Sequence, residues 1–246
     1  MNYNKYAGGL PPLLALWSAP RSRSTAFAAM MSARGDYTVL HEPFSHVKNF
    51  GEAEVDSRIV TTEDELIPAL RQLAHAGPVF FKDTTDFHYP GLLANRGFLT
   101  ETVHTFLIRQ PADAIASHYR MHPALARDEI GFAWLAEIYD AVAAATGRTP
   151  IVIDSDDLVE RPRETVRTYC QAIGIPFLEH ALSWQPGMRE AWRRTARWHE
   201  GASQTAGFVR AAPPDLAEIE ANPVLAGYLA YHLPFYEHLA AVALKA

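Results

Sequence analysis

The chain has 246 residues, of which 48% are hydrophobic and 20% are charged, the composition of a globular protein with a substantial core. The formal net charge of -6 excludes a general electrostatic attraction to nucleic acid or acidic membranes. Cys170 is the single cysteine, which excludes an intramolecular disulfide and a multi-thiolate zinc site and favours a cytoplasmic location. We therefore expect no nucleic-acid or membrane partner. Because no linker or repeat interrupts the chain, we expect one domain over residues 1–246, with its oligomeric state left open.

Short apolar runs alternate with helical patterns along most of the chain. The run LLALW at residues 13–17 predicts a buried strand, and residues 25–33 predict a helix that ends before Gly35. Further strands are predicted at residues 37–41, 78–82, 103–108 and 150–154, and further helices from Thr62 and at residues 111–121, 129–146 and 161–173. Residues 42–57 lack a clear period and are predicted to form a substrate-facing loop. This alternation predicts an α/β fold with a doubly wound, mainly parallel sheet flanked by helices, followed by a helical C-terminal part.

The segment between the first predicted strand and the first predicted helix reads SAPRSRSTA and is rich in anion-binding groups. The first turn of a helix offers unpaired N–H groups and a partial positive charge to an anion. Arg21 and Arg23 add full charges, and Ser22, Ser24 and Thr25 add hydroxyl donors. A capped helix with two solvated arginines is the simpler alternative. The Gly-Lys-Ser/Thr ending of a Walker A loop is missing, which disfavours a nucleoside-triphosphate kinase.

The same residues resemble the 5′-phosphosulfate-binding loop of sulfotransferases that use 3′-phosphoadenosine 5′-phosphosulfate (PAPS). Arg21 matches the basic position of that loop, Ser22 its serine, and Ser24 and Thr25 its paired hydroxyls. Arg23 stands where many members of the family have glycine, so a positive φ at this position would carry a conformational penalty. The resemblance implies a P-loop-like fold with PAPS as the donor.

A second stretch, FLIRQPADAIASHYR, resembles the 3′-phosphate motif of the same family. Arg109 and Ser117 keep the spacing of that motif, whereas Gln110 and Ala112 replace an acidic and a basic position. Arg109 ends a predicted strand, and ligands of doubly wound sheets bind beyond the carboxyl ends of the strands. The alternative role for Arg109 is a surface ion pair with Asp113.

Three residues are candidates for the chemistry of transfer. Glu42, in the sequence HEPF after the second predicted strand, resembles the proposed base of some bacterial sulfotransferases, and its neighbour His41 is the second choice. Lys82 ends another predicted strand and is assigned to the sulfuryl or bridging oxygens, where negative charge develops. A strand-end hydrogen bond for Glu42 and a salt bridge of Lys82 with a nearby aspartate are the structural alternatives. His88 is a candidate for the acceptor pocket.

Two further features bear on the prediction of function. His118 and His122 have a spacing that suits a metal on a helix, but no third ligand is obvious and no HExxH pattern exists, so no metal is predicted. Residues 151–177 resemble the supporting strand, turn and helix of the sulfotransferase family. Residues 197–208 are a candidate lid.

The sequence therefore predicts a PAPS-dependent sulfotransferase that acts on a hydroxyl or amine of a small-molecule acceptor and releases adenosine 3′,5′-bisphosphate. A P-loop-related kinase and a non-catalytic nucleotide-binding regulatory protein are the alternatives. Glu42 and Lys82 favour the enzyme over the regulatory protein, because a protein that merely binds nucleotide has no need of a carboxylate and an ammonium where transfer occurs. The sequence contains no pattern that identifies the acceptor.

Overall fold

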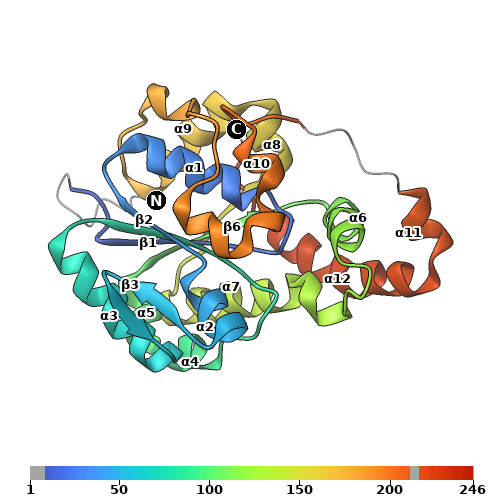
Figure 1. Cartoon of the computed structure of the whole chain (residues 1–246), viewed down its shortest axis with the longest axis horizontal. Coiled ribbons are helices and arrows are strands. Elements are labelled where there is room, and N and C mark those ends of the chain that lie inside the picture. Colours follow the sequence, from blue (N-terminus) through green and yellow to red (C-terminus); the bar gives the residue numbers. More distant parts are fainter. Residues whose placement is uncertain (1–8, 211–215, 246) are drawn as a thin grey trace.

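A sheet of five parallel strands forms the centre of the computed structural model, which describes residues 9–210 and 216–245 (Figure 1). The strand order is β2-β5-β1-β6-β7, so β1 lies in the middle, with β5 and β2 on one side and β6 and β7 on the other. The strands are β1 (Leu13–Ser18), β2 (Thr38–His41), β5 (Val79–Thr84), β6 (Val103–Ile108) and β7 (Ile151–Asp154). Every residue of β1 and β6 is buried, as expected for parallel strands covered on both faces. The predicted doubly wound, P-loop-like fold is confirmed.

Helices cover the sheet on both faces (Figure 1). One face carries α1 (Ser24–Arg34), α8 (Ser155–Glu160) and α9 (Pro162–Ile173). The other face carries α2 (Pro43–Phe50), α3 (Glu63–Ala76), α4 (Pro90–Ala94), α5 (Arg96–Glu101), α7 (Phe132–Thr146) and the long α12 (Pro223–Ala240). Helix α6 (Pro111–Met121) follows β6 with the bounds that the sequence predicts.

The two faces have separate hydrophobic cores because successive side chains of a strand point to opposite sides. From β1, Leu14 and Leu16 pack with the residues of α1 and α9, whereas Ala15 and Trp17 pack with those of α2, α3 and α7. Trp17 is fully buried, and its Nε1 donates a hydrogen bond to Nδ1 of His104 at 2.9 Å. The sheet is therefore anchored on both sides, and its strand ends are held in fixed positions.

Two predictions about local structure are wrong. The predicted loop at residues 42–57 contains α2 and the first strand of an antiparallel hairpin, β3 (Ala53–Val55) with β4 (Arg58–Val60). The helix predicted from residue 129 is divided by Gly131, whose φ of 84° separates a 3₁₀ turn, η2 (Arg127–Ile130), from α7. A Cβ at Gly131 would lie 2.5 Å from the carbonyl oxygen of Thr85, so this close approach requires glycine.

The C-terminal part is helical, as predicted, but much of it consists of short pieces. They are η3 (Glu179–Leu182), η4 (Glu190–Trp198), α10 (Glu200–Ser203) and α11 (Ala217–Ala221), before α12. Helices α11 and α12 extend to one side of the sheet (Figure 1). Among the described residues, none of the helices has both the length and the apolar character needed to cross a membrane.

Candidate active site

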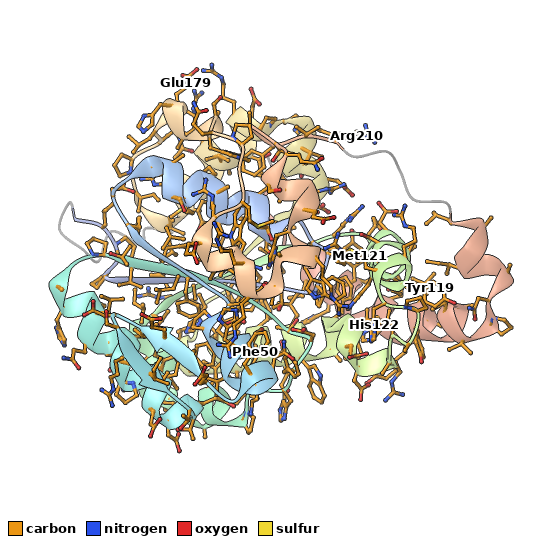
Figure 2. The ribbon with its side chains drawn as sticks, in the orientation of Figure 1. Phe50, Tyr119, Met121, His122, Glu179 and Arg210 are labelled. Atoms are coloured by element: carbon orange, nitrogen blue, oxygen red, sulfur yellow. The ribbon has the colours of Figure 1, made fainter. Side chains whose placement is uncertain are left out.

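A cavity of about 450 Å³ opens at the carboxyl ends of the parallel strands. Its walls come from residues 20–26, the ends of β2 and β5, helices α2 and α6, and the segment at residues 195–209. Figure 2 labels Phe50 at the end of α2 and His122 just after α6, two of the helices that contribute lining residues here. This is the edge of a doubly wound sheet where ligands bind.

The loop between β1 and α1 has an unusual backbone. Arg21 and Arg23 both adopt φ of 66°, in the left-handed region that favours glycine. The glycine-like conformation expected at Arg23 is thus present in spite of its side chain. Arg23 Nη1 donates to Asp156 Oδ1 at 2.6 Å and to Ser155 Oγ at 3.0 Å, contacts that help to offset the conformational cost. Arg23 is the N-cap of α1, and no side chain caps this helix.

The loop and the second predicted motif meet in the cavity. Arg21 Nε donates to Ser117 Oγ at 3.1 Å, and Arg109 Nη1 donates to the carbonyl oxygen of Arg21 at 2.9 Å. The Nη2 atom of Arg109 also lies 3.5 Å from Oδ2 of Asp113, so the ion pair predicted as the alternative role of Arg109 is present as well. Burial and the nearby Arg109 and Arg120 lower the pKa of Arg21 to about 10. Burial and Arg23 lower the pKa of Arg109. Crowded cations of this kind favour the binding of an anion.

The side chains of the loop between β1 and α1 differ in whether they line the cavity. Ser24 and Thr25 line the cavity together with Arg21 and Arg23. Ser22 is fully buried, is not part of the lining, and its hydroxyl has no hydrogen-bond partner among the described residues. A contact between the Ser22 hydroxyl and a ligand therefore stays a prediction that this arrangement does not support.

Glu42 and Lys82 form a buried ion pair at the ends of β2 and β5. Lys82 Nζ donates to Glu42 Oε1 and lies 3.4 Å from Ser24 Oγ, which connects the pair to the first loop. Burial is the largest single influence and acts to raise the pKa of Glu42, but the charge and hydrogen bond of Lys82, together with the nearby His41 and His199, outweigh it, and the pKa lies well below its usual range. Lys82 is paired with Glu42 and not with the aspartates expected as its alternative partners.

The turn that presents Glu42 is held by Asp83. Glu42 has φ of 52° and is followed by Pro43, the first residue of α2. Asp83 accepts hydrogen bonds from the backbone N–H groups of Phe44 at 2.6 Å and Ser45 at 3.1 Å. Burial raises the pKa of Asp83 to about 8, although these donors act in the opposite direction. The carboxyl group of Asp83, from β5, thus caps the N-terminus of α2 and fixes the position of Glu42.

His199, to which the sequence analysis gave no role, lies beside the predicted catalytic residues. Its Nε2 is 3.1 Å from His41 Nε2, and its Nδ1 is 3.1 Å from Thr25 Oγ1. Burial and the charge of Lys82 lower the pKa of His199 to about 4, and burial lowers the pKa of His41 well below its ordinary value. Both imidazoles are therefore neutral at pH 7. The sole sequence signal for His199 was its position in the candidate lid at residues 197–208.

The lid segment contacts the first loop directly. Arg21 Nη1 donates to the carbonyl oxygen of Trp198 at 2.9 Å, and the guanidinium lies over the Trp198 ring. Thr195 Oγ1 is 2.9 Å from His199 Nε2. The segment from η4 to α10 thus closes the cavity over the loop between β1 and α1.

Potential metal ligands occur at two places. His41, Glu42 and His199 offer ligand atoms within 4.8 Å of one another, although Lys82 already binds the carboxylate. His118 packs edge-on against Trp198, and within the described part of the chain His118 and His122 do not join a third ligand. The prediction of a metal-free site therefore stays a prediction.

The prediction that His88 lines the acceptor pocket is wrong for this arrangement. His88 is exposed, its Nε2 lies 3.1 Å from Glu137 Oε2, and its ring packs against Trp134. It is not among the residues that line the cavity. Asp86 and Phe87, which follow β5, line the cavity, whereas His88 lies outside it.

One protein family, two curated proteins and several solved structures are similar to this chain. The family model described as "Sulfotransferase domain" matches residues 13–243. Two curated proteins of Arabidopsis thaliana, branched-chain-amino-acid aminotransferase-like proteins 2 and 1, are 29% and 28% identical over 206 and 212 residues. These matches cover 78% and 80% of this chain but 35% and 37% of the relatives, so the chain spans about a third of their length.

Solved structures with the same fold include a sulfotransferase from Alicyclobacillus acidocaldarius. The two chains share 14% identity with a TM-score of 0.51, and the match covers 94% of each. A sulfotransferase domain from the curacin biosynthetic pathway is 15% identical, with a TM-score of 0.45 and coverage of 92% of this chain and 98% of that one.

Proposed function

This chain belongs to the sulfotransferase domain family, and from that premise we propose that it transfers a sulfuryl group from PAPS to a hydroxyl or amine of a small-molecule acceptor. The observation that carries the proposal is the meeting of the two anion-binding motifs in one cavity, where Arg21 contacts both Ser117 and Arg109. The pair of Glu42 and Lys82 lies next to them in the same cavity.

Each end of the donor has a matching set of groups. We assign the 5′-phosphosulfate to Arg21, Ser24, Thr25 and the uncapped N-terminus of α1, which combine charges with N–H and hydroxyl donors. We assign the 3′-phosphate to Arg109 and Ser117. Arg23, held by Asp156, supports the loop and adds positive charge.

In the transfer step, the acceptor oxygen or nitrogen forms a bond to sulfur as the bond from sulfur to the bridging phosphate oxygen breaks. The acceptor proton passes to Glu42, and the phosphate leaves as part of adenosine 3′,5′-bisphosphate. Lys82 stabilises the charge that develops on the sulfuryl and bridging oxygens. A sulfuryl group near Lys82 shares the ammonium with Glu42, which weakens the ion pair and makes Glu42 a stronger base.

The first test is the choice of nucleotide. We expect adenosine 3′,5′-bisphosphate to bind at least about tenfold more tightly than AMP, because an additional charge-assisted phosphate contact contributes roughly 1.5–3 kcal/mol. Isothermal titration calorimetry without Mg²⁺ measures this difference, and the nucleotide should also raise the melting temperature. Tighter binding of ATP than of adenosine 3′,5′-bisphosphate would contradict the proposal and favour the kinase.

The second test concerns the 3′-phosphate alone. We expect Arg109→Ala to weaken the binding of adenosine 3′,5′-bisphosphate by about 10- to 100-fold and to leave adenosine 5′-phosphosulfate, which lacks the 3′-phosphate, nearly unaffected. Calorimetry with both nucleotides provides the comparison. Arg148→Ala is the matched control, because Arg148 is exposed and lies outside the cavity. An equal loss for both nucleotides in a folded variant would show that Arg109 does not read the 3′-phosphate.

A further inference from the structure

The lining of the cavity carries charges of both signs. Arg21, Arg23 and Arg109 supply the positive charge that we assign to the donor. The lining also includes the carboxylates of Glu42 and Asp86. Asp86 lies just after β5, close enough to Glu42 for the two carboxylates to repel each other. The cavity proposed to hold an anionic donor thus also offers negative charge to a second ligand.

Asp86 is a carboxylate of the lining that the proposed chemistry leaves unused. Its Oδ1 accepts a hydrogen bond from Thr84 Oγ1 at 2.8 Å, and its own backbone N–H also bonds to it. Among the described residues, Asp86 has no ion pair with a lysine, arginine or histidine. The nearby Lys82 is paired with Glu42. Asp86 therefore faces the cavity with acceptor capacity to spare.

A cationic ligand fits this environment better than a neutral one. Burial and the charge of Glu42 raise the pKa of Asp86 to about 6, which leaves most of the carboxylate ionised at neutral pH. A partly desolvated carboxylate without a counterion is costly, and a cation from the ligand compensates for that cost. Phe87, the next residue, also lines the cavity and offers an aromatic surface to a cation or to the apolar part of the acceptor.

We propose that Asp86 and Phe87 form a subsite for an ammonium group, so that the acceptor is a small hydroxylated amine bound by its cationic end. This inference rests on the proposed sulfuryl transfer, because it places the ammonium at Asp86 and the acceptor hydroxyl at Glu42. The ammonium group donates to the free oxygen of Asp86 and remains protonated. It is therefore held away from sulfur, and the hydroxyl is the group that reacts.

Three phenols that differ at one end test the subsite. Tyramine ends in an ammonium group, 4-propylphenol in a methyl group, and 3-(4-hydroxyphenyl)propionate in a carboxylate. Each is titrated by calorimetry into protein saturated with adenosine 3′,5′-bisphosphate. We expect tyramine to bind at least about tenfold more tightly than 4-propylphenol, and the carboxylate to bind most weakly. Equal binding of the three, a preference for the carboxylate, or binding of none of them would overturn the proposal.

Asp86→Asn keeps the shape of the side chain and removes its charge. We expect this variant to bind tyramine and 4-propylphenol about equally, whereas Asp140→Asn, an exposed change on α7, keeps the preference of the wild type. A tyramine preference that survives Asp86→Asn would overturn the assignment. If Asp86→Asn fails to fold, the binding of the three phenols to the wild-type protein still tests the subsite.

The first step of the same experiment separates the two proposals. If adenosine 3′,5′-bisphosphate itself does not bind, the proposed function fails. If it binds but the ammonium preference is missing, the subsite alone fails.

Discussion

Replacing Glu42 by glutamine should lower the turnover number by about 10²–10⁴-fold, because the variant keeps the shape of the side chain but has no carboxylate to accept the acceptor proton. The affinity for adenosine 3′,5′-bisphosphate should stay close to that of the wild type, since the arginines assigned to the phosphates are unchanged. The measurement is sulfation of one confirmed phenol acceptor, followed by mass spectrometry at saturating PAPS. Glu101→Gln, an exposed change that is paired with Arg71, is the matched control.

The same assay distinguishes Glu42 from its two histidine neighbours. His41 and His199 lie in contact with each other and close to Glu42. If Glu42→Gln keeps near-normal turnover while His199→Asn or His41→Asn abolishes it, then the histidine accepts the proton and Glu42 serves to hold Lys82. If none of the three variants reduces turnover in a protein that still binds the nucleotide, the proposed base is wrong.

Lys82→Met should affect both activity and stability. Turnover should fall by about 10²-fold through lost stabilisation of the developing charge. The free energy of unfolding should fall by about 3–5 kcal/mol, because the variant leaves Glu42 as a buried carboxylate without its counterion. Denaturant unfolding measures the stability, and Lys245→Met, an exposed change, is the control. A Lys82→Met variant with wild-type stability and turnover would show that the ion pair has neither role.

The double variant Glu42→Gln/Lys82→Met separates these two roles. Removing both charges leaves no unpaired ion in the interior, so the double variant should be more stable than either single variant. Its turnover should remain low, because both proposed catalytic groups are gone. Recovery of activity together with stability would mean that the single variants were inactive merely because they were poorly folded.

Much of the fold follows from short-range patterns. The runs at residues 13–17 and 103–108 are apolar without alternation, which is typical of parallel strands covered on both faces, and both form central strands. Helix α6 begins at Pro111, a residue that favours the first turn of a helix. Such signals lie within a few residues of the element they predict, and for that reason they are readable.

The missed elements depend on distant partners. Helix α2 is short, and its first turn is fixed by Asp83, which lies on β5 some forty positions along the chain. Within residues 42–57, Pro43 at the first position of α2 is a local signal, but the contact with Asp83 cannot be read from this stretch. The break at Gly131 likewise depends on the approach of Thr85 from another part of the fold. The left-handed conformation at Arg23 could be anticipated, because the family resemblance marked this position as one where glycine is common.

In the candidate site, too, residues that belong to a motif could be predicted, whereas residues placed by distant contacts could not. The two motifs supplied Arg21, Arg109 and Ser117, and the structure brings them together. His199 comes from a stretch of short helical pieces without a motif, and its place beside Thr25 depends on how the lid segment folds over the first loop. His88 was a candidate for the acceptor pocket, but its two preceding neighbours, Asp86 and Phe87, line the cavity and His88 does not.

The central position of β1 also has a consequence for how the protein is made. During synthesis, β1 is translated before both strands that flank it, since Leu13 pairs with Val79 and Leu14 pairs with Val103. Until β5 has left the ribosome, the nascent chain carries an apolar segment with both edges unpaired, and one edge stays unpaired until β6 follows. Such long-range pairing slows folding and exposes surface that favours aggregation. We therefore expect production of the folded protein to be sensitive to translation rate and to the supply of chaperones that shield nascent apolar strands.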